Sequence, residues 1–362
     1  MVCPLDWGLG HATRCVPVIQ NFLDEGHQVI IGADKNPLAF LKEEFPKLKT
    51  VVIPGLTINY GEKGSSLKLF YESVKFLNYI KQEKQFIDEF LAANKVDMIV
   101  SDNRYGLYSD KIESIIITHQ LYPKAPVGEK LLHQKIEKLL GNFNEVWIPD
   151  FDGENNLSGD LAHLKPFQQK HKFIGALSRF SSSQPTTSCH TEFIEVSRNK
   201  QAFDFDICAI ISGPEPQRTI FEKLIFEQIE KHQLKAVVVR GLPEANVIAS
   251  CHPECSTEQS RSVIEGYTKQ SAKNDEILGQ ARNDGSIKIF NHLPTQQLQA
   301  YILKSKKVVC RSGYSSIMDL VALNKKAILV PTPGQTEQEY LAEYHHKKGL
   351  FVMQGQKQLN LG

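Results

Sequence analysis

The sequence predicts an α/β protein built from two doubly wound domains, each a mostly parallel sheet with helices on both faces. Short apolar runs of four to six residues alternate with amphipathic stretches along most of the 362 residues. These runs are apolar throughout, which is typical of parallel strands buried on both faces. The composition also shifts to Ser, Thr and Pro within residues 173–188, as expected at a junction between two domains.

The first domain is predicted to span residues 1–178 and to begin with a short strand, "MVC". A glycine-rich loop follows this strand, and the next helix ends at Gly26, before a strand over 28–33. Residues 67–91 mix aromatic side chains with lysines, which fits either a helix packed on the sheet or a basic helix on an anionic membrane. The other strands are expected in "KTVVIPG" (49–55), "DMIVSD" (97–102), "SIIITHQ" (114–120) and "NEVWIPDF" (144–151).

The second domain is predicted to span residues 204–362 and to repeat the same rhythm of strand and helix. Its strands are expected in "DICAIISG" (206–213), "KAVVVRG" (235–241), "IKIFNHL" (287–293), "KKVVC" (306–310) and "KAILVPTP" (326–333), with helices over 217–231 and 315–323. The short first strand and the ending at "NLG" suggest a partial chain.

Two polar segments interrupt this rhythm: a linker over 179–203 and an insertion over about 247–286. Both contain Ser-Cys-His-x-Glu followed by Ser-Arg, so they look like related segments, similar to translated bacterial repeat elements. Cys251, His252 and Cys255 are zinc-ligand types, but a structural zinc site needs four ligands. No second pair stands at a suitable spacing, so no zinc site is expected.

The composition narrows the classes of partner and compartment. A formal net charge of +1 gives no global field that would recruit nucleic acid, so nucleic acid is not expected as a partner. No apolar run reaches the roughly 20 residues of a membrane-spanning helix, and the N-terminus lacks the features of a signal peptide. Seven scattered cysteines, an odd number, are expected as free thiols in a reducing compartment. These features predict a cytoplasmic protein.

A loop with two glycines and a histidine, "DWGLGHATR" (6–14), follows the first strand. Gly8 and Gly10 let the backbone turn sharply and approach a ligand closely. His11 falls at the start of the next helix, at the edge of the sheet where ligands bind in open α/β proteins. With a pKa near its ordinary value of about 6.5, a histidine there can take a proton from a sugar hydroxyl, although it could equally cap or pack the helix.

Late in the chain, "CRSGYSSIMDL" (310–320) indicates a strand, a tight turn and the start of a helix. Free amides and partial positive charge at such a helix N-terminus suit a pyrophosphate, and Ser315 and Ser316 add hydroxyl donors. Asp319, one turn further, could accept hydrogen bonds from ribose hydroxyls or simply offset the helix dipole. The start of the following helix offers two polar side chains that could hold sugar hydroxyls or form a solvated turn, Gln338 and Glu339.

The order and spacing of "VVCRSG", the acidic residue at 319, "AILVP" and "EQEY" resemble the C-terminal domain of glycosyltransferase family 28, which includes the MurG enzymes. The resemblance is strong over the second domain and limited to a few loops of the first. It implies a GT-B fold, in which a nucleotide-diphosphate sugar, here a UDP-sugar, lies in a cleft between two Rossmann-like domains. Because "SDNRYGLYSD" (101–110) has no counterpart in MurG, the acceptor is expected to differ from the MurG acceptor.

The resemblance also implies site residues, with Phe290 beside the base and the backbone of Asn291 at its edge. His11 stands at the position of the catalytic base. The donor-binding residues predicted from the resemblance and from the helix starts are Ser212, Gly213, Arg218, Phe290, Asn291, Arg311, Ser312, Gly313, Ser315, Ser316, Asp319, Gln338 and Glu339. The acceptor-side residues predicted from the loops and strand ends of the first domain are Gly8, Gly10, Arg14, Asp102, Arg104, His119 and Gln120.

We therefore expect metal-independent, inverting transfer of a hexosyl or N-acetylhexosaminyl group from a UDP-sugar to a hydroxyl of an unknown glycan, lipid-linked or small-molecule acceptor, without a cofactor. A lipid-linked acceptor would add peripheral contact with the inner face of the membrane. Two Asp-x-Asp sequences, at 150–152 and 204–206, match the pattern of metal-dependent transferases, but such pairs are common by chance. The alternatives are a UDP-sugar 2-epimerase on the same fold and a non-catalytic nucleotide-sugar-binding protein.

Overall fold

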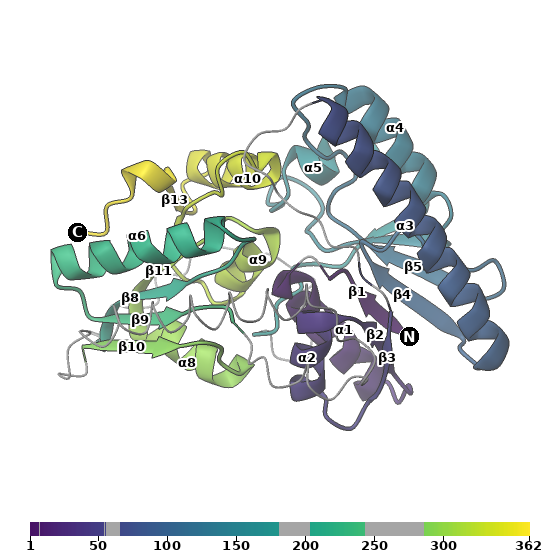
Figure 1. Ribbon diagram of the computed structural model, residues 1–362, viewed down its shortest axis with the longest axis horizontal. Helices are drawn as coiled ribbons and strands as arrows, with labels where there is room; N and C mark the ends of the chain where they lie inside the picture. Colours follow the sequence, from purple (N-terminus) through teal and green to yellow (C-terminus); the bar gives the residue numbers. More distant parts are fainter. Residues whose placement is uncertain (7, 54, 56–65, 181–202, 243–285) are drawn as a thin grey trace, which may run out of the picture.

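The chain folds into two α/β domains that lie side by side (Figure 1). The structure is a computed structural model that describes the chain except residues 7, 54, 56–65, 181–202 and 243–285, and the side chains of 66–74. Each domain contains one sheet in which every paired strand is parallel to its neighbour. The prediction of an α/β fold with two doubly wound domains is therefore confirmed.

The first sheet has the strand order β3-β2-β1-β4-β5-β6-β7, so the chain winds outward from β1 in both directions. Its strands are β1 (Val2–Pro4), β2 (Ile30–Ala33), β3 (Lys49–Val52), β4 (Met98–Asp102), β5 (Glu113–Ile117), β6 (Glu145–Ile148) and β7 (His171–Phe173). Its helices are α1 (Leu9–Asp24), α2 (Lys35–Glu44), α3 (Ser66–Ala93), α4 (Glu129–Leu140) and α5 (Asp160–His163).

The second sheet has the order β10-β9-β8-β11-β12-β13 and winds outward from β8 in the same way. Its strands are β8 (Phe205–Ile210), β9 (Ala236–Val239), β10 (Ile287–Phe290), β11 (Ser305–Cys310), β12 (Ala327–Leu329) and β13 (Val352–Met353). The helices described in this domain are α6 (Gln217–His232), α8 (Thr295–Lys304), α9 (Tyr314–Ala322), α10 (Thr336–Lys347) and the short 3₁₀ helix η2 (Gln356–Gln358).

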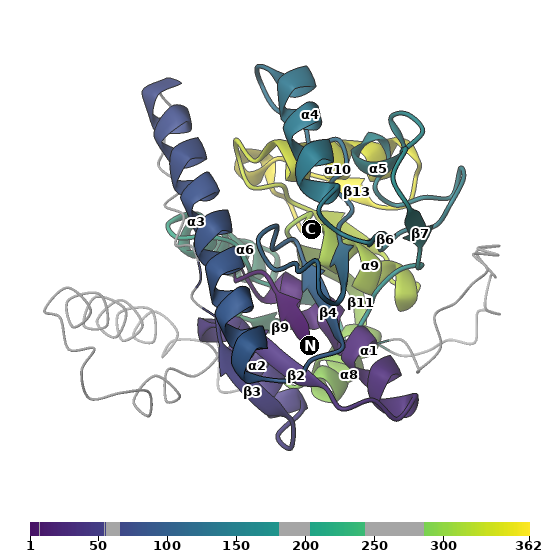
Figure 2. The same ribbon diagram turned by 90° about the vertical axis from the view of Figure 1, so that its right-hand side faces the viewer.

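The long helix α3 lies along one side of the first domain (Figure 2). Its buried residues Tyr79, Ile80, Glu83 and Ile87 recur at helical spacing, so this stripe packs against the domain. Of the two interpretations of residues 67–91, the contacts support a helix packed on the protein. No helix of the described residues is long and apolar enough to cross a membrane.

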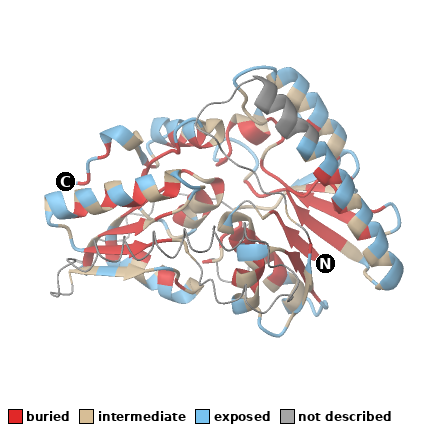
Figure 3. Ribbon diagram, viewed as in Figure 1, coloured by how far each residue is buried: buried red, intermediate tan, exposed pale blue. Residues whose placement is uncertain are grey.

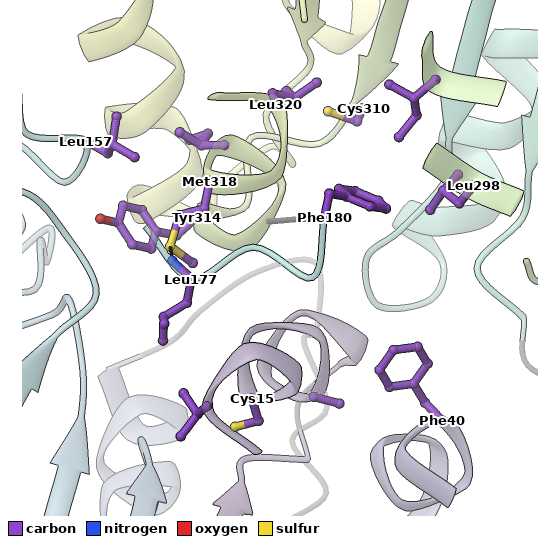
Figure 4. Packing of buried hydrophobic residues seen from close by; sticks show 14 of the residues in the cluster. Cys15, Phe40, Leu157, Leu177, Phe180, Leu298, Cys310, Tyr314, Met318 and Leu320 are labelled. Carbon is purple, nitrogen blue, oxygen red and sulfur yellow. Dashed lines mark hydrogen bonds between the residues drawn. The ribbon is translucent and has the colours of Figure 1, made fainter. Parts of the chain in front are cut away.

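Buried side chains fill both sheets, and the outer helix faces are exposed (Figure 3). One apolar cluster continues from the first domain into the second, with Cys15 of α1 and Tyr314 and Met318 of α9 among its members. Leu177, on the segment that connects the domains, lies against α9, where its backbone N–H contacts the Met318 sulfur at 3.2 Å (Figure 4). This shared core holds α1 and α9, which follow the carboxyl ends of β1 and β11, against each other.

The predicted linker and insertion, with their Ser-Cys-His sequences and Cys251, His252 and Cys255, lie almost entirely outside the described residues. Two strands that the sequence analysis did not predict complete the sheets at their edges, β7 and β13. β7 reads "HKF" and shows no apolar run, whereas β13 has only two residues, at the end of the apolar run "LFVM" (350–353).

Candidate active site between the two domains

The glycine-rich loop after β1 brings a histidine to the edge of the first sheet. Gly8 precedes α1 with a φ of 141°, a backbone conformation that side-chain-bearing residues rarely adopt. Helix α1 then begins at Leu9, so His11 lies in its first turn with 19% of its side chain exposed. The loop thus positions one partly exposed imidazole at the carboxyl ends of the strands.

His11 contacts a buried ion pair. Asp102 is the last residue of β4, which pairs with β1, and its Oδ2 lies 3.0 Å from His11 Nδ1. Arg14, one turn along α1, donates to Asp102 Oδ2 from Nε at 2.8 Å and also binds Oδ1 through Nη2. Arg14 Nη2 also lies 2.8 Å from His11 Nδ1. The structure therefore joins three predicted residues, His11, Arg14 and Asp102, in one cluster.

The charges in this cluster favour a neutral imidazole beside an ionised carboxylate. Burial and the Arg14 guanidinium lower the pKa of His11 below its ordinary value of 6.5, against the opposing effect of Asp102. Burial alone would raise the pKa of Asp102, but Arg14 and His11 lower it overall. In the tautomer with the proton on Nδ1, His11 donates to Asp102 Oδ2 and Nε2 can accept a proton, as a general base must. The Arg14 Nη2 contact with Nδ1 is a hydrogen bond only in the other tautomer, because a guanidinium N–H donates.

On the side of the second domain that meets the first, three strand-to-helix corners adjoin one another. Arg311, after β11, donates from Nη2 to the carbonyl oxygen of Gln217, in the first turn of α6, at 2.9 Å. Ser312 Oγ donates to the carbonyl oxygen of Gln338, in the first turn of α10, at 2.7 Å. A Cβ built on Gly213, after β8, would lie 3.9 Å from Thr332 Oγ1, after β12. The N-termini of α6, α9 and α10 are therefore held in one row.

The two domains touch at this row. Ser315 Oγ, in the first turn of α9, donates to the carbonyl oxygen of Gly10 at 2.7 Å. The approach is close, because a Cβ on Gly10 would lie 3.1 Å from Ser315 Oγ. The predicted donor-side residue Ser315 and the predicted acceptor-side residue Gly10 are thus direct neighbours, and the helix N-terminus of the second domain faces the loop that carries His11.

A second contact across the cleft involves Glu337, in the first turn of α10. His119 and Gln120 follow β5, and both predicted acceptor-side residues bind this carboxylate: His119 Nε2 lies 2.8 Å from Oε1 and Gln120 Nε2 donates to Oε2 at 2.6 Å. The His119 ring stacks on the ring of Tyr314, with centroids 3.9 Å apart. Burial alone would raise the pKa of Glu337, but its hydrogen bond with His119 and the charges of His119, Arg14 and His11 lower it overall.

Both arginines predicted beside the diphosphate are engaged within the protein. Arg311 is 1% exposed and donates to the carbonyl oxygens of Val330 and Pro331 as well as Gln217. Arg218 is buried between two carboxylates, with Nε 2.6 Å from Glu215 and Nη1 3.0 Å from Glu222. These contacts make Arg311 and Arg218 supports of the corners, and a direct contact of either with a phosphate stays a prediction.

Several other predicted donor residues also bind protein groups. Asp319 Oδ1 accepts a hydrogen bond from Ser178 Oγ at 2.6 Å, and burial raises its pKa to about 6. It therefore contacts the interdomain segment at Ser178, and its role as a ribose ligand stays a prediction. The buried Gln338 accepts from the Thr332 backbone N–H at 2.9 Å, and Glu339 accepts from the N–H of Gly334 at 2.8 Å. Neither of these helix-start side chains is directed at the cleft.

The predicted placement of Arg104 beside the cleft is wrong. Its side chain is fully buried, with Nε 2.6 Å from Glu83 on α3. At the end of β10, the partly buried Phe290 ring packs on Tyr301, with centroids 5.2 Å apart, and its position beside the base stays a prediction. The Asn291 carbonyl oxygen accepts from the N–H of Leu242, so it already has a partner. The remaining predicted residues Ser212, Gly213, Gly313 and Ser316 lie at the corners and are partly or fully exposed.

Sequence reasoning missed three residues at this row: Thr332, Glu337 and Arg240. Thr332 Oγ1 is buried and has no hydrogen-bond partner among the described residues. Arg240 follows β9 and donates from Nη1 to Asn291 Oδ1 at 3.1 Å. The signal available for all three was position, since each directly follows a strand or begins a helix at the carboxyl edge of the sheet.

The acidic pairs named in the sequence analysis are tied to protein groups. Asp150 accepts from the N–H groups of Leu157 and Ser158, and Asp206 pairs with Lys306 at 2.7 Å. Within the described part of the chain, no group of three or more His, Cys, Asp or Glu side chains is arranged to hold a metal ion.

Residues 236–361 match the model of the glycosyltransferase family 28 C-terminal domain. The matched residues make up most of the second domain and less than half of the chain. No curated protein matches the chain in sequence. The family match confirms the resemblance inferred from the motifs between residues 308 and 344, and it includes the row of corners after β11 and β12.

Solved glycosyltransferases share the fold of the whole chain. UGT89C1 of Arabidopsis thaliana, in complex with quercetin, is 13% identical with a TM-score of 0.55, over 99% of this chain and 85% of that one. SnogD of Streptomyces nogalater is 10% identical with a TM-score of 0.55, over 99% and 88% of the two chains. MurG of Acinetobacter baumannii is 11% identical with a TM-score of 0.50, over 99% and 86%. The chain therefore shares the GT-B fold of these glycosyltransferases.

Proposed function

We propose that the protein transfers a hexosyl or N-acetylhexosaminyl group from a UDP-sugar to a hydroxyl acceptor, with inversion and without a metal ion. The observation that carries this proposal is the position of His11. Its partly exposed imidazole is held by Asp102 on one side of the cleft, directly opposite the helix N-termini of the family 28 domain. This arrangement supplies a base on one side and an anion-binding row on the other.

The diphosphate would lie at the N-termini of α6 and α9. The backbone N–H groups there and the partial positive charge of the helices stabilise the negative charge that develops on the leaving UDP. Gly213, with a φ of 116°, lets the chain approach a phosphate closely. The Thr332 hydroxyl, which is buried without a partner among the described residues, is a further donor beside Gly213.

The reaction is a single displacement. The acceptor oxygen attacks the anomeric carbon from the face opposite the diphosphate and forms the new glycosidic bond. The bond between the anomeric carbon and the phosphate oxygen breaks, and its electron pair leaves with UDP. His11 Nε2 takes the acceptor proton, and Asp102 stabilises the imidazolium that results. The product has the opposite anomeric configuration to the donor.

The proposal keeps the acceptor open among glycans, lipid-linked molecules and small molecules. It assigns the reaction to the cytoplasm, in peripheral contact with the inner face of the membrane if the acceptor is lipid-linked, with no cofactor besides the donor.

The decisive experiment measures product. Purified protein is incubated with UDP-hexoses and an acceptor pool, and free UDP and glycosylated product are followed by mass spectrometry, with His11→Ala as the comparison. Transfer by the wild type that falls by about 10²–10⁴-fold in the variant supports the proposal. An isomeric UDP-sugar without an acceptor requirement would instead identify an epimerase. Donor binding without turnover over the full acceptor pool would identify a nucleotide-sugar-binding protein.

A further inference from the structure

The two domains also meet where the end of α2 lies against the start of α8 (Figure 1 and Figure 2). Glu44, the last residue of α2, accepts a hydrogen bond at Oε1 from the Thr295 hydroxyl at 2.6 Å, and the Thr295 backbone N–H lies 3.4 Å from the same oxygen. Thr295 is the first residue of α8 and stands 251 positions further along the chain. A residue of the first domain thus binds the N-terminus of a helix in the second domain.

The start of α8 has no cap from its own domain. Pro294 occupies the N-cap position without a side-chain hydrogen bond, and the first turn contains no acidic residue. Because the first four N–H groups of a helix have no partner within that helix, its N-terminus carries free donors and a partial positive charge. Proline has no side-chain oxygen that could bind these donors. The Glu44 carboxylate supplies both the acceptor and the negative charge that the second domain lacks at this point.

The end of α2 holds its carboxylates where its own helix disfavours them. Glu43 and Glu44 are the last two residues of α2, and its last turn has one basic residue, Lys42. The C-terminal end of a helix carries a partial negative charge, so acidic side chains there are unfavourable. The helix does not continue past them, because Phe45 precedes Pro46 and a residue before proline avoids the helical conformation. Contact with α8 therefore offsets an unfavourable charge at one helix end and supplies a missing cap at the other.

Apolar and aromatic contacts support this pair of helix ends. Phe40 of α2 is buried in the apolar cluster that both domains share, and Leu298 of α8 belongs to the same cluster (Figure 4). The His292 ring meets Phe40 edge to face, with centroids 5.9 Å apart, and its Nε2 lies 3.9 Å from Glu43. Arg179, on the segment that connects the domains, places its guanidinium carbon 5.6 Å from the Phe40 ring centroid. The contact between α2 and α8 therefore has an apolar base as well as a charged edge.

We propose that the end of α2 is an interdomain latch, in which Glu44 caps α8 across the domain boundary and stabilises the closed arrangement of the two domains. When the domains separate, the N-terminus of α8 loses its cap and the Glu44 carboxylate is left at the negative end of its own helix. Both effects favour the closed arrangement. The latch is made by Glu44 and Thr295, supported by Phe40, Glu43 and His292. This inference does not depend on which reaction the protein catalyses.

Hydrogen-exchange mass spectrometry tests the latch, because amides covered by the other domain exchange from the open form. The variants are Glu44→Gln and Thr295→Val, and the control is Glu25→Gln, at the end of α1. Glu25 is 54% exposed, and the contacts described for it lie within its own domain. Each latch variant should speed exchange by about 2- to 30-fold, the effect of losing one helix cap, both in the first turn of α8 and around Ser315, which touches Gly10 of the first domain. The control should exchange as wild type.

Three further comparisons decide whether the contact acts as a latch. The double variant Glu44→Gln, Thr295→Val should exchange no faster than the faster single variant, because both substitutions break the same contact; effects that multiply would overturn the inference. Faster exchange confined to the first turn of α8 would show a local cap without influence on the domains, and would also overturn it. Equal acceleration in β5, which is buried in the first sheet, would show general destabilisation and contradict the latch. Unchanged exchange around Ser315 in both single variants has the same meaning.

Discussion

Replacing Asp102 by Asn tests the geometry on which the proposed mechanism depends. The carboxylate binds Arg14 through both oxygens and lies 3.0 Å from His11 Nδ1, while its own side chain is fully buried. An amide of the same size has one acceptor oxygen, so it cannot satisfy the guanidinium and orient the imidazole together. The exchange also leaves the Arg14 charge buried without its counter-ion.

Two separate losses follow from this change. Breaking a buried ion pair by removing one charge costs about 3–5 kcal/mol of unfolding free energy. Loss of an oriented base costs about 10²–10⁴-fold in rate, so we expect kcat to fall by that factor while the donor KM changes little. The assay is steady-state UDP release with saturating donor and acceptor, alongside urea denaturation of each variant.

A matched control distinguishes the rate effect from the stability effect. Glu83→Gln breaks another buried ion pair of the first domain, that with Arg104, whose Nε lies 2.6 Å from Glu83. It should lower the unfolding free energy by a similar amount and leave kcat of the folded fraction near that of wild type. If Asp102→Asn is folded and retains more than about a third of the wild-type kcat, the assignment of Asp102 as the residue that orients the base is refuted.

Three further predictions follow from the same contacts. Burial and Arg14 lower the pKa of His11, and only the neutral imidazole accepts a proton. In a pH–rate profile, kcat/KM should therefore stay constant down to pH 6.5 and decrease at lower pH. A decrease that begins above pH 7 would contradict this. Burial raises the pKa of Asp319 from 3.8 to about 6, so the folded state binds the proton more tightly than the unfolded state. The unfolding free energy should therefore decrease by up to about 3 kcal/mol as pH rises from about 4 to about 6. Asp319→Asn should therefore raise the unfolding free energy at pH 7.5 with unchanged UDP affinity, and weaker UDP binding would support the ribose role. Gly159 has a φ of 54°, and a Cβ there would lie 2.3 Å from the Tyr340 hydroxyl. Gly159→Ala should therefore lower the unfolding free energy, measured by urea denaturation, by about 1–3 kcal/mol. If the contact with Tyr340 is the cause, adding Tyr340→Phe should recover part of this loss.

The strands were predictable because burial on both faces leaves a continuous apolar run in the sequence. Ile115, Ile116 and Ile117 of β5, for example, are all at most 2% exposed, and the run "SIIIT" shows this directly. The edge strands β7 and β13 have three and two residues; β7 contains the polar residues His171 and Lys172, and β13 is too short to be told from the end of a loop. A strand that pairs on one side and is partly solvated carries no comparable signal.

The candidate site was predictable in position and less so in detail. Residues at the carboxyl ends of neighbouring parallel strands converge, so His11, Asp102 and His119 could be grouped without a structure. Which of these side chains faces the cleft depends on partners far away in the sequence. Arg104 turns inward because Glu83 is available 21 positions earlier, and His119 finds Glu337 at a separation of 218 residues. An arginine after a strand looks the same in the sequence whether its side chain turns inward to a buried carboxylate or outward to the site.

The contacts across the cleft connect binding of the donor to completion of the site. The base loop meets α9 through Gly10 and Ser315, and the acceptor-side loop meets α10 through His119, Gln120 and Glu337. In the proposed mechanism, each contact joins a group that acts on the acceptor to one that lies beside the donor. The base is oriented within the first domain by Asp102, and these contacts bring it to the row of helix N-termini of the second domain. An open form would expose the anomeric carbon to water without a positioned acceptor, and the division of the site between two domains thus favours transfer over hydrolysis.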